Sequence, residues 1–383
     1  MNAKNTLSQP SNDPLHFARN VVLKGLLLFF IVNLAFTFLN PGPFLGRISA
    51  YNRLWPGRSR LPYGDNPLRA YNLSLFNLEA MFASHELSTG PKPAGEYRVL
   101  LVGDSATWGF LLQPEHTLAA YINAADHALP DGRRLRAYNL GYPVMSLTKD
   151  LLILTYAVRY QPDLIVWPLT LESFPYDKQL YPPLLQNNPE AVRELIHSHR
   201  LKLDPDSPDL IDFSFWDGTL IGQRRNLADL IRLQLFGIMW AATGIDQDIP
   251  PTYTPRMEDL PAEENFHDLQ PPHLTQNDLA FDVLAAGIRL AGNTPILLVN
   301  EPMFISRGEN SHLRYNFFYP RWAYDDYRRL MAEYTRSNDF YYRDLWDTVP
   351  PSEFTNSAVH LTPNGTVQLS RHLIQAIAEL AGE

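Results

Sequence analysis

The segment at residues 97–109 constrains the fold of this chain most strongly. Its first part, 98–102, is dominated by apolar side chains and is typical of a strand buried in a parallel sheet. The strand ends at Gly103, Asp104 and Ser105, which is where open α/β sheets place their chemistry. The glycine permits a sharp turn, and Ser105 could then act as a nucleophile beside backbone N–H groups. Asp and Ser are also common helix caps, so a purely structural role stays open here.

Strands and helices alternate around this segment. Strands are expected at 98–102, 136–139, 163–168, 294–300 and 340–345, and helices at 117–128, 146–160, 277–291, 321–334 and in the later part of 363–380. The alternation predicts a three-layer α/β/α domain with a parallel sheet and helices on both faces. Right-handed crossovers bring the strand ends to one edge, where Ser105, Gly141 and the loop after Trp167 should meet.

Three short segments follow one another along this domain. They are Gly103-Asp-Ser-Ala-Thr-Trp-Gly109, Tyr138-Asn-Leu-Gly141, and Ala358-Val-His360-Leu-Thr-Pro-Asn-Gly365 ahead of an amphipathic helix. In this order they resemble the SGNH (GDSL-type) hydrolase family over roughly residues 97–380, apart from a large insert. The first and last segments are specific, and the middle one is not. The resemblance implies a flavodoxin-like fold and acyl transfer through a serine.

The resemblance also assigns roles to single residues. Ser105 is then the nucleophile and His360 its general base. The backbone N–H groups of Ser105 and Gly141 are the first two oxyanion donors. Asp104 is expected to orient the loop by hydrogen bonds rather than to react, and Trp108 either lines an acyl pocket or belongs to the core.

The chain departs from the family in its third segment. A Gly-x-Asn-Asp sequence is expected after the strand at 163–168, where this chain has Thr170, Glu172 and Ser173. The missing amide donor to the oxyanion could be replaced by the hydroxyl of Thr170 or by the amide of Asn300, at another strand end. A carboxylate at Glu172 would repel an oxyanion unless it points away or is protonated.

A second departure concerns the acid that normally precedes the histidine. Three residues before His360 the chain has Ser357, and Asn356 stands one position earlier. Neither carries the negative charge that steadies an imidazolium. Asp344 or Asp347, at the end of the last strand, are the other candidates for orienting the base. With none of them in place, the loss could approach about 10⁴-fold, and a Ser-His dyad remains.

The N-terminal region predicts a membrane anchor. A polar tail at 1–20 precedes 21–39, nineteen residues whose single charge is Lys24. This length suits a transmembrane helix, and Lys24 can reach the interface. No small-residue cleavage site follows, which favours a signal anchor over a signal peptide, while a buried core helix stays open. Arg19 and Lys24 predict a cytoplasmic tail and an extracytoplasmic domain.

Two further regions are distinguished: one precedes the predicted 97–383 domain and the other is an insert within it. Residues 40–96 are expected to form a juxtamembrane collar and linker, with a helix at 72–84 capped by Asn72. Its arginines would face lipid headgroups or an anionic polymer, or the stretch simply wraps the domain. They are Arg47, Arg53, Arg58, Arg60 and Arg69. The proline-rich insert at 174–280, with a helix at about 223–240, is either a lid or decoration.

Several classes of function are disfavoured. A net charge of −9 argues against nucleic acid, and the absence of cysteine excludes disulfides and thiolate sites. The pair His197 and His199 has no third ligand nearby, so neither a metal nor a cofactor is expected. There is no phosphate-binding glycine loop and no Gly-x-Ser-x-Gly elbow.

The sequence therefore predicts a membrane-anchored, extracytoplasmic serine acyl-ester hydrolase, with an acyl ester or acylated glycan as substrate and lipid around residues 21–39. One alternative, implied by the resemblance, is an O-acyltransferase that modifies a cell-surface polysaccharide beside a membrane-bound acyltransferase. Hydrolysis and transfer differ only in whether water or a sugar hydroxyl attacks the acyl-enzyme. A non-catalytic scaffold is the third possibility, supported by the altered third segment and the missing acid.

Overall fold

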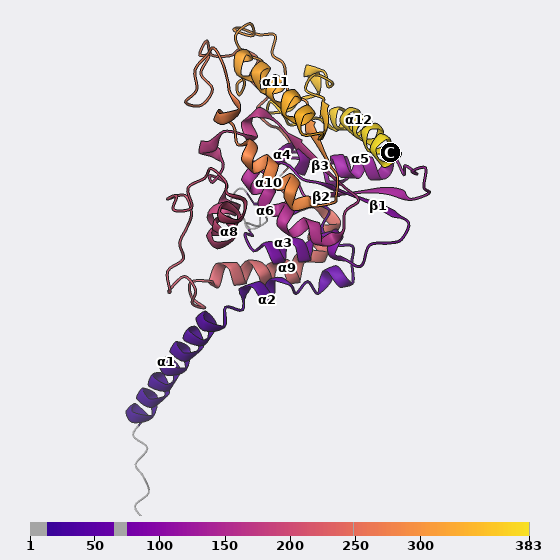
Figure 1. Ribbon diagram of the computed structural model, residues 1–383. Helices are drawn as coiled ribbons and strands as arrows, with labels where there is room; N and C mark the ends of the chain where they lie inside the picture. The colour runs from indigo at the N-terminus through magenta and orange to yellow at the C-terminus, as the bar shows by residue number, and fades with distance from the viewer. Residues whose placement is uncertain (1–13, 65–74, 248, 383) are drawn as a thin grey trace, which may run out of the picture.

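The computed structural model describes residues 14–64, 75–247 and 249–382 (Figure 1). Its sheet has five parallel strands in the order β2-β1-β3-β4-β5. The strands are β1 (Glu96–Leu101), β2 (Arg134–Asn139), β3 (Leu164–Leu169), β4 (Ile296–Asn300) and β5 (Tyr341–Asp344). This is the flavodoxin-like order, whose connections change direction between β1 and β3. The predicted α/β fold is therefore confirmed.

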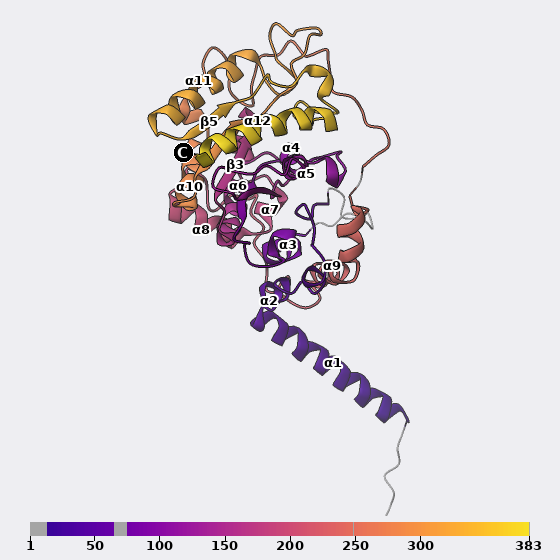
Figure 2. The same cartoon turned by 90° about the vertical axis from the view of Figure 1, so that its right-hand side faces the viewer.

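Helices cover both faces of the sheet (Figures 1 and 2). Alternate side chains of a strand point to opposite faces, so Val99 and Leu101 enter one core and Leu100 the other. The first core contains α5 (Leu118–Ala124) and α12 (Pro363–Gly382). The second contains α3 (Leu78–Ser84), α6 (Leu147–Ala157), α10 (Phe281–Ala291) and α11 (Arg321–Ser337). All five residues 98–102 are buried, as a central strand requires.

Polar caps set the starts of several helices. Ser146 caps α6 by accepting a hydrogen bond from Lys149 N at 3.2 Å, and Thr117 caps α5. The collar helix expected at 72–84 is α3, which begins at Leu78 and is capped by Asn77. The predicted cap, Asn72, lies outside the described residues.

Several connections contain a single turn of 3₁₀ helix. These turns are η2 (Glu86–Ser88), η3 (Pro114–His116), η4 (Val158–Tyr160), η5 (Leu171–Ser173), η6 (Tyr176–Lys178), η7 (Gln276–Asp278) and η8 (Pro351–Glu353).

The apolar N-terminal helix α1 (Pro14–Leu39) projects away from the domain (Figure 1). Asn33 is its only buried residue, so the alternative of a core helix is wrong. Two short elements, α2 (Gly42–Gly46) and η1 (Tyr51–Arg53), then lead the chain along the underside of the domain. Length and composition make α1 one candidate membrane span within the described residues.

Two collar arginines point into the protein rather than toward solvent or lipid. Arg58 and Asp246 form an ion pair in which each side chain is 3% exposed. Arg60 donates to the carbonyls of Gly109 at 2.8 Å and Leu112 at 3.0 Å, and its guanidinium lies over the Trp108 ring. Arg60 therefore stabilises the loop after Ser105, and Arg58 joins the collar to the segment after α9. Arg69 lies outside the described residues.

The 174–280 insert is packed onto the domain. It contains α7 (Pro183–Gln186), α8 (Pro189–His199) and α9 (Arg224–Thr243). Apolar residues of all three belong to the same core as α6. Further along, the Arg256 guanidinium donates to Phe354 O at 2.6 Å, and its backbone N–H donates to Thr355 O at 3.1 Å. The insert thus supports the loop that carries Asn356 and His360.

The buried pair between Arg58 and Asp246 predicts an unequal response to loss of two aspartates. Asp246→Ala leaves a buried guanidinium without its carboxylate and should lower the free energy of unfolding by about 3–5 kcal/mol. Asp212→Ala removes a partner of Arg193 that is 73% exposed, so it should change little. Chemical denaturation followed by tryptophan fluorescence measures both, and equal losses would contradict the prediction.

Candidate active site

Ser105 is the first residue of a one-turn helix, α4 (Ser105–Trp108), directly after β1. Asp104 Oδ1 caps that helix by accepting a hydrogen bond from Ala106 N at 2.7 Å. Gly109 ends it at φ 86°, a conformation that side chains with a Cβ rarely adopt. The serine therefore stands where the connections of the sheet change direction, which is the usual location of a site in this fold.

His360 is brought to Ser105 from the loop that precedes α12. Its Nε2 lies 2.8 Å from Ser105 Oγ, and its Nδ1 lies 2.9 Å from Asn356 Oδ1. An amide oxygen only accepts hydrogen bonds, so this arrangement assigns the proton to Nδ1. Nε2 is then free to accept the hydroxyl proton of Ser105. The three side chains form a Ser-His-Asn relay, with an amide in the place of the usual carboxylate.

The aspartates considered for orienting the base do not contact the histidine. Asp344 binds the Arg328 guanidinium at 2.7 Å and accepts from the Asn300 amide at 2.8 Å. Asp347 is exposed, and Asp104 is bound to the backbone of α4. Of the residues considered for orienting the base, Asn356 is the one that the structure places beside His360.

Burial lowers the pKa of His360 to about 4. The ring lies between Ser105 and Phe110, whose ring centre is 5.0 Å from that of the imidazole. No carboxylate offsets the desolvation of the imidazolium, because the partner of Nδ1 is a neutral amide. The imidazole is consequently neutral at pH 7 and can accept a proton.

The two backbone N–H groups that are predicted to bind the oxyanion differ in their surroundings. The N–H of Ser105 belongs to the first turn of α4, where no intrahelical acceptor exists. The N–H of Gly141 donates to Asn139 Oδ1 at 3.0 Å. A Cβ at Gly141 would lie 2.4 Å from Trp108 N, so the glycine is needed for close approach to α4. Its role as a second oxyanion donor stays a prediction, which requires the bond to Asn139 to open.

Two side-chain donors expected for the oxyanion are engaged elsewhere. The hydroxyl of Thr170 is buried and pairs with Tyr319 Oη at 2.8 Å. The amide of Asn300 donates to Asp344, and its oxygen accepts from Tyr324 Oη at 3.2 Å. Each side chain is used to join its strand end to α11 and the loop before it, so the structure does not direct either toward Ser105.

Two further side chains resolve alternatives left open by the sequence. Glu172 is held by Lys178 at 2.5 Å and by His267 at 3.2 Å, so its charge is paired with that of Lys178. Trp108 is 5% exposed, and its indole N–H donates to Leu61 O at 2.9 Å. It therefore belongs to the core, beneath the loop that follows α4.

A cluster of buried charged groups lies beneath the nucleophile loop. Lys149 Nζ donates to the carbonyls of Gly103 and Tyr142, both at 2.7 Å, and lies 2.6 Å from Asp150 Oδ1. Asp104 and Glu301 complete the cluster. Burial raises the pKa values of all three carboxyl groups, and that of Glu301 rises well above its ordinary 4.5 because Asp104 and Asp150 add negative charge beside it.

One proton shared by Asp104 and Glu301 explains how these two carboxyl groups can both be buried in the cluster. Asp104 Oδ2 and Glu301 Oε1 are buried and have no donor within the described part of the chain. A hydrogen bond between the two carboxyl groups also contributes to the raised pKa of Glu301. A protonated Glu301 satisfies both oxygens and lowers the excess negative charge that Asp104 and Asp150 place around Lys149.

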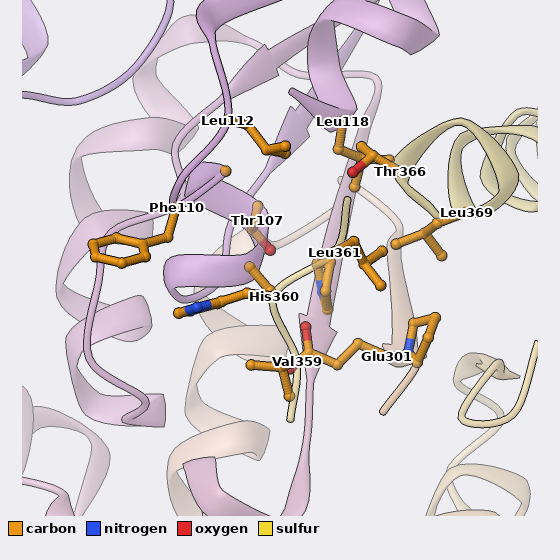
Figure 3. A pocket seen from close by; sticks show the side chains of 14 residues that line it. Thr107, Phe110, Leu112, Leu118, Glu301, Val359, His360, Leu361, Thr366 and Leu369 are labelled. Carbon is orange, nitrogen blue, oxygen red and sulfur yellow. The ribbon is translucent and has the colours of Figure 1, made fainter. Parts of the chain in front are cut away.

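A small cavity of about 20 Å³ lies behind His360. Figure 3 shows the imidazole turned toward Phe110, while Leu361, Thr366 and Leu369 gather on the other side of the loop. The cavity has room for about one water molecule, not for an acyl group. None of the cavity-lining residues belongs to the 174–280 insert.

The sequence patterns singled out the serine and the histidine but missed the groups that support them. Asn139 is fully buried and bridges β2 to α4 through Gly141 N and Trp108 O. Lys149 and Asp150 are adjacent opposite charges in a helix that is otherwise mainly apolar, which is a signal that could have marked them as buried and paired. No sequence pattern indicated that Glu301 would face Asp104.

The comparisons with known proteins add only distant similarities. No family model matches the chain, and no curated protein matches it. A carbohydrate acetylesterase family member from Sinorhizobium meliloti is 12% identical with a TM-score of 0.32, over 75% of this chain and 99% of that chain. The aryl esterase of M. smegmatis is 11% identical with a TM-score of 0.34, over 74% and 99%.

A catalytic mutant of an acetylxylan esterase from Geobacillus stearothermophilus is 12% identical with a TM-score of 0.35, over 73% of this chain and 94% of that chain. Identities and TM-scores this low support no statement about the function of the present chain. The function therefore has to be inferred from the geometry around Ser105.

The contact between Asn356 and His360 predicts the effect of restoring a carboxylate. Asn356→Asp should raise the pKa of His360 from about 4 by about 1–3 pH units, because a negative charge beside Nδ1 favours the imidazolium. An NMR titration of the imidazole nitrogens measures this, with His360→Gln assigning the signal. Asn338→Asp, at an exposed position, is the matched control. An unchanged pKa in Asn356→Asp would show that residue 356 does not face the ring.

The raised pKa of Glu301 predicts a pH-dependent cost to stability. Above pH 4.5, the ordinary pKa of the group, the unfolded chain releases a proton that the folded chain retains. Stability therefore falls as pH rises toward the folded pKa, by up to about 1.4 kcal/mol per pH unit for one proton. Glu301→Gln should remove this slope, whereas Glu309→Gln, at an exposed position, should keep it. Parallel pH profiles of unfolding for Glu301→Gln and the native chain would contradict the shared proton.

Proposed function

We propose that this chain is a serine ester hydrolase of the SGNH type, with Ser105 as nucleophile. The observation that carries the proposal is the linked geometry of Ser105, His360 and Asn356, with distances of 2.8 Å and 2.9 Å. A serine hydroxyl bonded to an oriented, neutral imidazole is the arrangement that nucleophilic acyl transfer requires. If Ser105 had only a structural role at the start of a helix, it would not need a histidine beside its hydroxyl.

The chemistry follows from the assigned protons. Ser105 Oγ attacks the ester carbonyl while its proton moves to His360 Nε2. The N–H of Ser105 donates to the developing oxyanion. The imidazolium then protonates the departing alcohol, which leaves an acyl-serine. A water molecule, deprotonated by the same Nε2, attacks that acyl-serine and releases the acid, so that serine and histidine return to their starting state.

Asn356 orients the base without adding charge. Its oxygen holds the Nδ1–H tautomer of His360, as the carboxylate does in a Ser-His-Asp triad, but it cannot stabilise the imidazolium electrostatically. The consequence is a base that remains deprotonated to low pH and that is less strong at neutral pH than one paired with an aspartate.

The proposal includes a membrane anchor. Helix α1 has 26 residues and is almost entirely exposed, so its apolar surface needs a partner outside the domain. A helix of about 20 apolar residues spans the hydrocarbon core of a bilayer. Arg19 and Lys24 favour an N-terminus on the cytoplasmic side, which puts the Ser105 domain outside. The substrate is then an extracytoplasmic ester, for which an acylated glycan is the class we expect.

The test compares the detergent-solubilised chain with single variants. The native chain should hydrolyse p-nitrophenyl acetate and react with a fluorophosphonate probe. Ser105→Ala and His360→Gln should each reduce hydrolysis by about 10⁴-fold or more, because neither residue works without the other. Ser337→Ala, at an exposed position, should retain full activity and labelling.

The outcomes separate the alternatives. Labelling of Ser105 without turnover would favour an acyltransferase that lacks its sugar acceptor. The absence of both labelling and turnover in a folded chain would contradict the proposal and favour a non-catalytic scaffold. Labelling that persists in Ser105→Ala would place the nucleophile elsewhere.

A further inference from the structure

The exposed apolar residues of the domain are unevenly distributed. Beyond α1, the large hydrophobic side chains that are exposed in the described residues fall mainly in two segments, 44–55 and 211–245. Outside these segments they are Tyr181, Tyr253, Met257 and Tyr341. The two segments lie at the end of the domain from which α1 emerges, as both views show (Figures 1 and 2). Exposed apolar surface gathered in this way marks an interaction site.

The loop 213–221 packs directly against the last turns of α1. Ile221 N donates to Asn33 Oδ1 at 3.2 Å, and the ring centres of Phe38 and Phe215 are 6.2 Å apart. Asn33 lies six residues before the end of α1, which corresponds to about 9 Å along the helix axis. If α1 spans a bilayer, this loop therefore lies within its interfacial layer, whose depth is about 5–10 Å.

Helix α9 presents two different faces. Leu233 and Trp240 are buried, and Gly237 lies against the Tyr51 ring, where a Cβ would come within 2.4 Å. On the opposite side Ile231, Leu235 and Ile238 are 58%, 73% and 43% exposed. Their i, i+4, i+7 spacing forms one continuous stripe on the helix. An apolar stripe on the solvent side of a helix already packed on its other side requires a second apolar partner.

The residues around the stripe suit a lipid surface. Trp216 is 65% exposed and Trp55 is 46% exposed, and tryptophan is enriched where membrane meets water. Arg224 is exposed in the first turn of α9, and Arg53 is exposed next to Leu54. Arginines beside apolar side chains attract anionic headgroups while the apolar groups enter the layer below.

We propose that α2, η1, the loop 213–221 and the outer face of α9 form a membrane-docking surface that lies in the same bilayer interface that α1 enters. This inference rests on the proposed membrane anchoring of α1 and is independent of the chemistry at Ser105. The bilayer covers the apolar stripe of α9, and α1 and α9 together hold the domain against the membrane in one orientation. The segment that follows α1 then holds the domain in a fixed orientation and does not act as a flexible linker.

The absence of cysteine allows a direct test by site-specific labelling. The full chain is reconstituted into vesicles containing anionic lipid, with one nitroxide label at Leu235→Cys or Trp216→Cys. Electron paramagnetic resonance then compares collisions with oxygen, which concentrates in lipid, and with a water-soluble nickel chelate. Ser337→Cys, exposed at the end of α11, is the aqueous control, and Leu27→Cys in α1 reports on anchoring.

The expected result is a higher ratio of oxygen to nickel collisions at residues 235 and 216 than at 337, with the highest ratio at 27. A lipid-like ratio at 27 with an aqueous ratio at 235 and 216 would overturn the docking surface and leave the anchor intact. An aqueous ratio at 27 would overturn both. Low collision rates with both reagents at 235, together with spin–spin broadening, would show a second copy on this face instead of lipid.

Discussion

A single buried ammonium group ties together the segments that converge on Ser105. Lys149 reaches from α6 to the carbonyl of Gly103, two residues after β1, and to the carbonyl of Tyr142 after β2. The Gly103 carbonyl also accepts from Tyr142 N at 2.9 Å, so the ammonium group and this backbone hydrogen bond together join the segments that follow β1 and β2. Asp150 balances the charge of the ammonium group beside it. The four-residue helix α4 that carries Ser105 is too short to be stable alone. The hydrogen bonds of Lys149 to the backbone before it therefore help to keep the turn in place.

Much of the architecture could be predicted because it depends on local patterns. The apolar run at 98–102 and the glycine after it specify a buried strand and a turn, and the alternation of strands and helices specifies the layers. His360 could be placed opposite Ser105 only through the order of the short segments, since 255 residues separate the two in sequence.

The remainder depended on contacts that no local pattern encodes. Thr170 and Asn300 stand at strand ends, as an oxyanion donor should, but tyrosines from the region of α11 occupy them. Arg58 and Arg60 have the composition of a headgroup-binding stretch, yet the ends of α4 and α9 supply carbonyls and a carboxylate that draw them inward. Asn356 was one of several candidates for orienting His360, and only the geometry of the 354–360 loop distinguishes it.

The amide beside His360 also sets the acidity that the site tolerates. A histidine with a pKa near 4 is still about 90% deprotonated at pH 5, whereas one with an ordinary pKa of about 6.5 is only about 3% deprotonated. A carboxylate partner would bring the base closer to that second case. Having asparagine in place of aspartate beside the histidine gives up basicity at neutral pH and preserves the neutral imidazole in acidic surroundings, which would matter at the extracytoplasmic location that we propose for the domain.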